Sequence, residues 1–378
     1  MEYTKLKCIN QYKSENINPS KTPNTVFEMY SVPIYETGHP EYLRGDEIAS
    51  NKVVVQKNDI LLCKINPRIN RVWVVSDESD KMNIASSEWI VIRNNEYNPE
   101  FLAWYFRTPK FQKLMISEVT GIGGSLTRAQ PKCVSEYPVP VLEKVKQDEI
   151  VNTLNKCKLV LTLRKQELIL LDKLIKARFV EMFGNPVSNS YGLPKATLPE
   201  LGEFGRGVSK HRPRNDPRLL DGEYPLVQTG DVANANLYIT SYNSTYSELG
   251  LKQSKMWRKG TLCITIAANI AKTAILEFDA CFPDSVVGFI ANEKTNNIFI
   301  HYWFSFFQAI LESQAPESAQ KNINLKILSG LKIIVPEKEK QNEFVDFVYQ
   351  VDKSKFAVQK GLEEAQKLFD SLMQKYFS

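Results

Sequence analysis

The chain has 378 residues, too many for one domain of ordinary size, so two or more modules are expected. Hydrophobic residues make up 43% and charged residues 24%, as in globular proteins, which excludes disorder as the main state. The net charge of +5 results from 48 basic and 43 acidic residues, so a nucleic-acid site would have to be a shaped surface and not a basic tail. Neither a signal peptide nor a membrane-spanning apolar stretch is found, and we expect a cytoplasmic location.

The sequence contains an internal repeat. Residues 146–151 (KQDEIV) resemble residues 340–345 (KQNEFV) at an offset of 194. The same offset aligns Phe183 with Phe377 without a gap. Because a repeat of this kind reflects a repeated structural unit, the two halves of the chain should have related folds.

Each repeated segment begins an apolar stripe with alternating spacings of four and three residues. One stripe runs from Ile150 to Met182, interrupted by Arg164 and Arg178, and its counterpart runs from Phe344 to Tyr376. This spacing predicts two long amphipathic helices. The first should end at residues 183–186, where Gly or Asn can take the left-handed cap and Pro prevents continuation. Because exposure of either apolar stripe to water is unfavourable, the two helices are expected to pair as an antiparallel coiled coil.

The segments before the long helices also resemble each other. Apolar runs around polar turns predict a β-hairpin in each half, followed by one further strand and an aromatic-rich helical segment. In the first half these are Leu62–Cys63 with 71–74, then 86–92 and 99–116; in the second they are Leu262–Cys263 with 272–275, then 284–290 and 296–312.

These patterns predict an α+β fold with an internal pseudo-twofold repeat. Two globular domains, mostly β with short helices, would be separated by two long helices that form the antiparallel coiled coil. The expected boundaries are a first globular domain at 1–138, a central long helix at 139–185, a second globular domain at 186–334 and a C-terminal long helix at 335–378.

Catalytic motifs are missing from the sequence. There is no phosphate-binding GxxxxGK[ST] loop, and Asn66-Pro67-Arg68 is the nearest approach to the Asn-Pro-Pro-aromatic motif of amino-methylating enzymes. The six cysteines form no CxxC pair, so we interpret them as reduced core residues and expect no metal site. Of the three histidines, His301 lies in an aromatic helix and is expected to be a packed residue. The sequence favours binding over catalysis.

Several polar segments combine positive charge, turn residues and amide side chains. Arginine and lysine can bind phosphates or guanine, and asparagine can pair with adenine, so these segments are candidate DNA contacts. A solvated basic loop without such a role is the alternative for each of them. The candidates are Lys64, Asn66, Arg68, Asn70 and Arg71 at the first hairpin tip, Asn269 and Lys272 at the second, Arg206, Ser209, Lys210, His211, Arg212 and Arg214 in a Gly/Pro-broken loop, and the weaker matched pair Thr127 and Arg128 with Lys321, Asn322 and Asn324.

With its repeat and long helices, the chain resembles the specificity subunits of type I restriction-modification systems over essentially its whole length. The clearest local matches are residues 58–68 (NDILLCKINPR), residues 221–231 (DGEYPLVQTGD), and Val335-Pro336 leading into Lys340-Gln341. The order of these phrases, together with the repeat, makes the match specific.

The resemblance implies a DNA-binding subunit without enzymatic activity. Each globular domain would be a target-recognition domain that reads one half of a split double-stranded DNA target, and the helix pair would set the gap. The chain itself would bind no cofactor. The expected partners are two methyltransferase subunits that use S-adenosylmethionine and two restriction subunits that use ATP and Mg.

Two other functions remain open from the sequence. A stand-alone sequence-specific DNA-binding regulator would share the two domains but keep the outer face of its helices solvated. A coiled-coil protein adaptor would not bind DNA, or would bind it without salt dependence.

Overall fold

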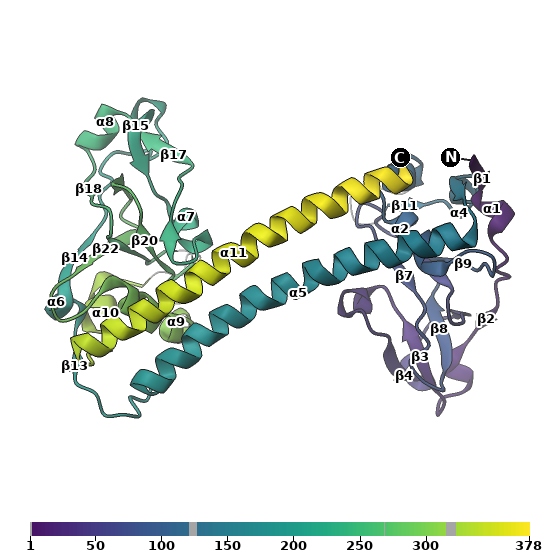
Figure 1. The fold of residues 1–378 in the computed structure, drawn as a ribbon, viewed down its shortest axis with the longest axis horizontal. Coiled ribbons are helices and arrows are strands. Elements are labelled where there is room, and N and C mark those ends of the chain that lie inside the picture. The colour runs from purple at the N-terminus through teal and green to yellow at the C-terminus, as the bar shows by residue number, and fades with distance from the viewer. Residues whose placement is uncertain (1, 121–126, 268, 315–322) are drawn as a thin grey trace. The chain divides into compact units, whose positions relative to one another are not determined.

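The computed structural model describes residues 2–120, 127–267, 269–314 and 323–378 (Figure 1). The chain divides into two compact units: unit 1 is residues 1–165 with 360–378, and unit 2 is residues 166–359. Two long helices, α5 (Lys144–Phe183) and α11 (Lys338–Phe377), are continuous through this division. Each unit therefore contains the first part of one long helix and the last part of the other. Within the described ranges, no helix is both long enough and apolar enough to cross a membrane.

Unit 1 contains a three-stranded antiparallel sheet in the order β7-β6-β9 and a five-stranded sheet in the order β2-β5-β8-β3-β4. The bounds of the first sheet are β7 (Val72–Val74), β6 (Ile60–Cys63) and β9 (Trp89–Ile92); those of the second are β2 (Asn16–Ile17), β5 (Lys52–Val54), β8 (Met82–Ser86), β3 (Val26–Tyr30) and β4 (Glu41–Arg44). Two short pairs, β1 (Glu2–Lys5) with β12 (Pro138–Val141) and β10 (Val119–Thr120) with β11 (Arg128–Ala129), complete its strands. Its other α-helices are α1 (Leu6–Ile9), α2 (Pro99–Phe106), α3 (Pro109–Ser117) and α4 (Pro131–Ser135).

Unit 2 contains a five-stranded sheet in the order β14-β22-β19-β20-β16 and a four-stranded sheet in the order β17-β15-β21-β18. The bounds are β14 (Gly202–Arg206), β22 (Val286–Ala291), β19 (Leu262–Thr265), β20 (Thr273–Leu276) and β16 (Tyr238–Ile239), then β17 (Ser244–Tyr246), β15 (Leu220–Leu226), β21 (Ala280–Cys281) and β18 (Met256–Trp257). The strands β13 (Lys195–Ala196) and β23 (Ile333–Ile334) pair separately. The helices are α6 (Leu198–Leu201), α7 (Thr229–Asn234), α8 (Glu248–Lys252), α9 (Asn297–Gln314) and α10 (Leu325–Gly330).

The predicted hairpin and following strand are confirmed in both units. In unit 1, β6 pairs with β7 on one side and β9 on the other; in unit 2, β19 pairs in the same way with β20 and β22. The helical segment that follows differs between the units. In unit 1 it is two helices, because Thr108 caps a new helix at Pro109, whereas α9 of unit 2 is continuous.

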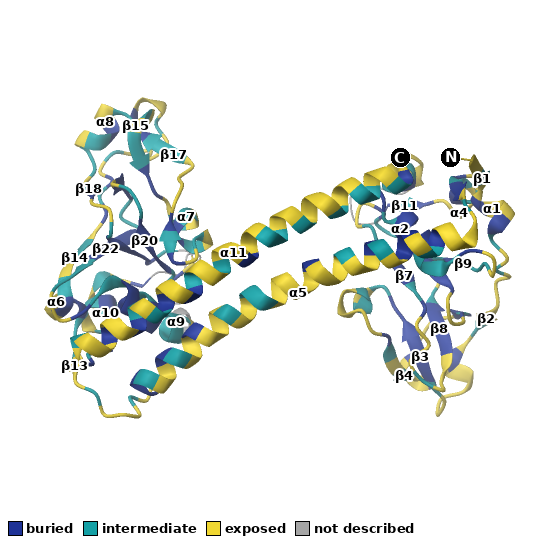
Figure 2. Ribbon diagram, in the orientation of Figure 1, coloured by how far each residue is buried: buried dark blue, intermediate teal, exposed yellow. Residues whose placement is uncertain are grey.

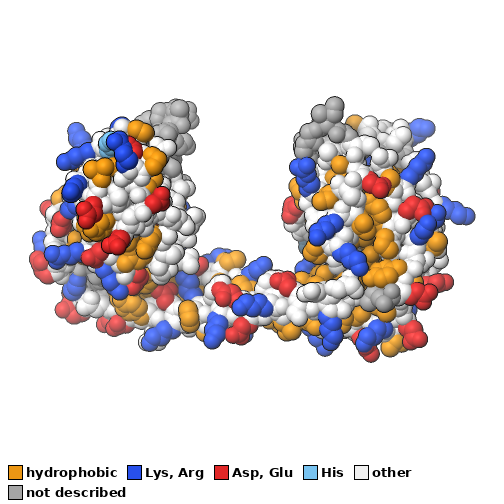
Figure 3. All heavy atoms as spheres, turned by 90° about the horizontal axis from the view of Figure 1, so that it is seen from above, with side chains coloured by type: hydrophobic (Ala, Val, Ile, Leu, Met, Phe, Trp, Pro, Cys, Tyr) orange, Lys and Arg blue, Asp and Glu red, His pale blue; other side chains and the backbone are white. Residues whose placement is uncertain are grey.

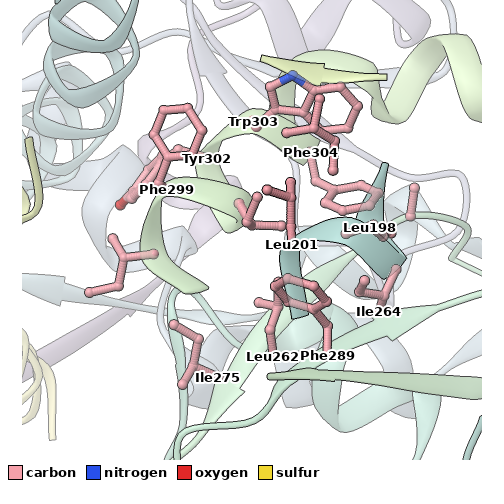
Figure 4. Packing of buried hydrophobic residues seen from close by; sticks show 14 of the residues in the cluster. Leu198, Leu201, Leu262, Ile264, Ile275, Phe289, Phe299, Tyr302, Trp303 and Phe304 are labelled. Carbon is pink, nitrogen blue, oxygen red and sulfur yellow. The ribbon is translucent and has the colours of Figure 1, made fainter. Parts of the chain in front are cut away.

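An aromatic cluster attaches both long helices to the core of unit 2. The ring of Phe179 in α5 lies 5.2 Å from Phe299 of α9 and 5.3 Å from Phe344 of α11, measured between ring centroids. Phe183 lies 5.2 Å from Phe299. Figure 4 shows Phe299 and Tyr302 of α9 in the same hydrophobic cluster as the sheet residues Ile275 and Phe289. The end of α5 is thus part of the core of unit 2.

In unit 1, aromatic residues near the end of α11 pack against the globular part, as the end of α5 does in unit 2. The ring centroid of Phe377 lies 5.6 Å from that of Phe101 in α2. Trp104 of α2 contacts Phe369 of α11 at 5.6 Å and donates a hydrogen bond of 2.9 Å to Asn155 Oδ1 of α5. The end of each long helix therefore packs in the unit whose globular part comes from the other half of the chain.

The two helices run antiparallel within each unit. In unit 2 the start of α11, at Phe344, packs near the end of α5, at Phe179, and Lys355 pairs with Asp172 at 2.6 Å. Figure 2 shows buried positions recurring among exposed ones along both helices. This confirms the predicted fold class of globular units with an antiparallel helix pair.

One part of the predicted stripe is shifted. Arg178 and Met182 were expected on the apolar face, but the fully buried positions near the end of α5 are Phe179 and Phe183. A straight helix with 3.6 residues per turn drifts from a repeat of 3.5, so after several heptads the next residue along the chain faces the core.

We predict that Phe377→Ala lowers the free energy of unfolding by about 3–5 kcal/mol, because it removes a large buried side chain from a closed aromatic cluster. Phe356, also in α11, is 75% exposed whereas Phe377 is 2% exposed, so Phe356→Ala should change stability little. Chemical denaturation of the two variants checks this. Equal effects would contradict the anchoring role of Phe377.

Candidate nucleic-acid interface

The first hairpin tip and the Thr127–Arg128 segment meet in unit 1. The amide of Asn66 donates to the carbonyl of Thr127 at 2.8 Å, and the amide of Ala129 donates to the carbonyl of Lys64 at 2.9 Å. The backbone of Asn66 has a positive φ of 45°, a conformation that asparagine adopts more often than most residues. Two candidate segments that are some distance apart in sequence therefore form one surface.

The side chains at this tip have different roles. Arg68 is exposed, and its carbonyl accepts a hydrogen bond of 2.7 Å from Gln112. Asn70 donates to the carbonyl of Phe106 at 3.3 Å and so ties the loop to α2. Arg128 is paired with Glu88 through two contacts of 3.1 and 3.3 Å. Arg68 is the side chain of this group that is best placed to contact a ligand.

Arg71 lies at the other end of the loop, near the buried Cys63. Burial raises the pKa of the Cys63 thiol, and the charge of Arg71 acts against that rise. The Cys63 thiol also donates to the carbonyl of Ile65 at 3.4 Å. This thiol therefore packs as a neutral group beneath the loop.

The basic loop of unit 2 is held by polar side chains from other elements. The amides of Lys210 and His211 both donate to Gln253 Oε1, at 2.6 and 3.0 Å. His211 Nε2 lies 3.0 Å from Asp216. The Arg218 guanidinium, 2.7 Å from Asp216, holds the pKa of that carboxyl well below its usual range. The loop is thus a defined structure with an internal charge pair.

Two of its arginines share one carboxylate. Arg214 contacts Asp284, and Arg212 lies 3.4 Å from the same carboxylate. Arg212 also donates to the carbonyls of Ser209 and His211, at 2.6 and 2.8 Å. The arginines therefore shape the loop as well as carrying its charge.

The remaining candidates in this loop differ in exposure. Arg206 was expected in this loop but is the last residue of β14, where it pairs with Val287. Arg206 and Lys210 are exposed, whereas Ser209 is buried, and the Ser209 hydroxyl has no hydrogen-bond partner among the described residues.

The second hairpin tip repeats the arrangement of the first. The amide of Ile323 donates to the carbonyl of Ile266 at 3.0 Å, so the segment that begins at residue 323 lies against the tip. Asn269 is exposed, and its carbonyl accepts hydrogen bonds from the Thr265 hydroxyl and, at 3.3 Å, from the amide of Lys272.

The third group of candidates in unit 2 follows this segment. Asn324 caps α10 by accepting a hydrogen bond of 2.9 Å from the amide of Ile327. Lys321 and Asn322 lie outside the described residues.

Residues 284–285 connect the basic loop to the second hairpin tip. Asp284 contacts the arginines, while the carbonyl of Ser285 accepts a hydrogen bond of 3.0 Å from the amide of Ile266. The sequence could not indicate this junction, because Asp284 is about 70 residues from the arginines it pairs with. Nor could spacing identify Glu88, Gln112 or Gln253 as loop-holding residues.

The candidate DNA-binding surface cannot be identified from its charge alone. Figure 3 shows Lys and Arg side chains interspersed with Asp and Glu on the visible face of each unit.

His301 is a packed residue, as predicted: its Nδ1 lies 2.9 Å from the Thr273 hydroxyl, and burial lowers its pKa to about 4. Within the described ranges, no group of three or more His, Cys, Asp or Glu could hold a metal ion.

Comparisons with known proteins agree with these features. A family model, the type I restriction modification DNA specificity domain, matches residues 195–366. The putative type I restriction enzyme MjaX specificity subunit of Methanocaldococcus jannaschii is 21% identical over 348 residues, which cover 85% of this chain and 77% of that protein.

Two solved structures have a similar fold. One is a chain from work on complex assembly and conformational transition of the type I R-M system, with a TM-score of 0.64, 19% identity and coverage of 100% of this chain and 97% of that chain. The other is the S subunit of a type I restriction-modification system from M. genitalium, with a TM-score of 0.61, 14% identity and coverage of 100% and 96%.

We predict that Asp284→Asn raises the affinity for DNA of unrelated sequence by about tenfold at low salt, because it removes the carboxylate charge that two arginines share and leaves their positive charge to act on phosphates. Asp279→Asn is the matched control, since the exposed Asp279 accepts a hydrogen bond from the Lys259 amide at the opposite end of the β19–β20 hairpin. Titration at two salt concentrations measures the effect. Unchanged affinity in Asp284→Asn would show that these arginines do not face DNA.

Proposed function

We propose, given that this chain belongs to the family of type I restriction-modification specificity subunits, that it recognises a double-stranded DNA target made of two separated parts. The observation that supports this most is the repeated tip. Each unit carries a β-hairpin whose loop accepts a hydrogen bond from the segment that follows the aromatic helix, at Lys64 from Ala129 in unit 1 and at Ile266 from Ile323 in unit 2. Two equivalent surfaces in one chain are suited to two half-sites.

The chemistry of these surfaces fits reading in the major groove. Arginine can bond guanine O6 and N7, asparagine can bond adenine N6 and N7, and both can bind phosphates. Arg68 and Arg206 are exposed, and neither has an ion-pair partner among the described residues. In this proposal they contact DNA directly, while Arg128 and Arg212, already paired with carboxylates, position their loops.

The helix pair would fix the gap between the half-sites. α5 and α11 have 40 residues each, and their apolar faces are buried at both ends. Half-sites about 34–36 Å apart present the same groove face one turn along the duplex, so rigid helices favour one separation.

Exposed apolar side chains on α5 support recruitment of partner proteins. Leu159 and Leu163 lie on the part of α5 in unit 1, and Leu170 and Leu174 on the part in unit 2; all four are exposed. Their spacings of four, seven and four residues place them on one side of the helix. A stand-alone regulator would have a polar face here, so this observation favours a subunit that binds methyltransferase and restriction subunits.

Catalysis would belong to those partners. Methylation requires the target adenine to leave the base stack and enter a pocket, which the methyltransferase subunits would provide together with S-adenosylmethionine. ATP and Mg would be bound by the restriction subunits. The chain would contribute recognition, in the cytoplasm, without a cofactor of its own.

The proposal is tested by modification-sensitive sequencing of DNA from cells that express this chain with its methyltransferase subunit. We expect methyladenine at one split motif only when both proteins are present. The control expresses the methyltransferase subunit alone. If the proteins co-purify but no motif is methylated, the recognition role is wrong; if they do not associate, the regulator or adaptor function is favoured.

We predict that Arg68→Ala and Arg206→Ala each relax base preference in one half of the motif only, by about 10- to 100-fold at the affected position. Lys57→Ala and Arg258→Ala are matched controls, because both residues are exposed at the ends of the hairpins away from the tips. The same sequencing measures the preference. Loss in both halves from one substitution would contradict modular reading.

A further inference from the structure

The repeated phrase at the start of each long helix contains a buried glutamine that the DNA-reading surfaces do not explain. Gln147 is 1% exposed and Gln341 is 0% exposed, although glutamine is usually found at the surface. They are equivalent under the repeat, and each is the fourth residue of its helix. Their surroundings differ from those of the other glutamines in α5 and α11, such as the exposed Gln166 and Gln374.

In unit 1, Gln147 joins two chain segments. Its Nε2 donates to the carbonyl of Leu142, two residues before α5 begins, at 2.8 Å. Its Oε1 accepts from the amide of Asn98 at 2.8 Å, immediately before α2. Asn98 in turn donates from Nδ2 to Asp148 at 2.7 Å. The starts of α5 and α2 are thus held together by side-chain amides.

Gln341 makes the equivalent connection in unit 2. Its Nε2 donates to the carbonyl of Pro336, two residues before α11 begins, at 2.9 Å, and to the carbonyl of Lys294 at 3.0 Å. Its Oε1 accepts from the Thr295 hydroxyl at 2.9 Å. Lys294 and Thr295 precede α9 as Asn98 precedes α2. The same contact therefore occurs twice, built from different residues on the globular side.

An apolar residue could fill either position without the cost of burying an amide. A buried amide whose nitrogen and oxygen are both hydrogen-bonded instead fixes the direction of the helix, because a tilt would leave carbonyls and amides unpaired in an apolar environment. At 1.5 Å per residue, each long helix is about 60 Å in length, so a tilt of about 10° at its start moves the far end by about 10 Å. That is about three base-pair steps of DNA.

We propose that Gln147 and Gln341 are positioning residues that fix the direction in which each long helix leaves its recognition unit, and thereby the gap length that the protein accepts. This inference rests on the proposed function. Neither glutamine contacts DNA in this account. They act through the helices, and the Phe183 and Phe377 anchors hold the far ends.

The test uses the full chain with its methyltransferase subunit and modification-sensitive sequencing. Gln147→Met and Gln341→Met, singly and together, keep a side chain of similar length but remove its hydrogen bonds. We expect methylation of motifs whose gap differs by one base pair to rise about tenfold relative to the preferred gap, because roughly two hydrogen bonds no longer oppose a tilt. The half-site sequences should be unchanged.

Gln166→Met and Gln374→Met are the matched controls and should leave the gap distribution as in the wild type. Thr295→Val is a milder variant, because it removes one hydrogen bond to Gln341 with little change of shape. It should broaden the gap distribution in the same direction, and it keeps the test possible if the double variant does not fold. Thermal unfolding of every variant separates a loss of folding from a change of gap.

The outcomes are distinguishable. If the wild type methylates no split motif, the proposed function fails and the inference with it. In a second outcome, the wild type methylates a split motif with one gap length, and the Met and Val variants methylate the same motif to an equal or uniformly lower extent. The glutamines then serve stability alone, so the inference is overturned while the proposed function stands. A broader gap distribution in these variants alone supports the inference.

Discussion

Burial of the ends of the two long helices is the constraint on which the rest of the structure depends. Phe183, at the end of α5, packs against Phe299 in unit 2, and Phe377, at the end of α11, packs against Phe101 in unit 1. Each compact unit is therefore completed by a helix that begins after the other unit's globular part. Because large aromatic side chains supply much of the free energy of a core, neither unit has a complete core without the other half of the chain.

This arrangement separates the parts that pack from the parts that can vary. The apolar faces of the helices and the hairpin strands are buried, so their residues are constrained by packing. The hairpin tips and the basic loop lie outside these cores, and are held by a few polar contacts such as Gln112 to Arg68 and Gln253 to Lys210. Exposed residues such as Arg68 and Arg206 can be substituted without loss of the fold.

Much of the fold could be predicted from sequence because it rests on periodic or repeated patterns. The offset of 194 residues and the spacing of apolar residues indicated the two long helices, and the paired apolar runs indicated both hairpins. The docking of each helix end in the opposite unit was not predicted, because periodicity shows which face is apolar but not what covers it. Phe179 and Phe183 replaced the expected Arg178 and Met182 on the buried face because a straight helix drifts from the 3.5-residue repeat.

The roles of individual residues in the candidate site could not be predicted from the sequence in the same way. Loop composition identified basic segments, but it could not distinguish exposed Arg68 from Arg128, which pairs with Glu88, or from Asn324, which caps α10. These roles depend on contacts between residues that are distant in the chain. Lys321 and Asn322 remain predictions from sequence.

Hydroxyl-radical footprinting of the chain with its methyltransferase subunit on DNA carrying the methylated motif tests the central claim most directly. If each unit reads one half-site and the helix pair sets the gap, the minor-groove and backbone protection should form two patches over the half-sites. Loss of the Arg68 side chain should weaken one patch and loss of the Arg206 side chain the other. A single continuous patch that both substitutions weaken equally would contradict the account.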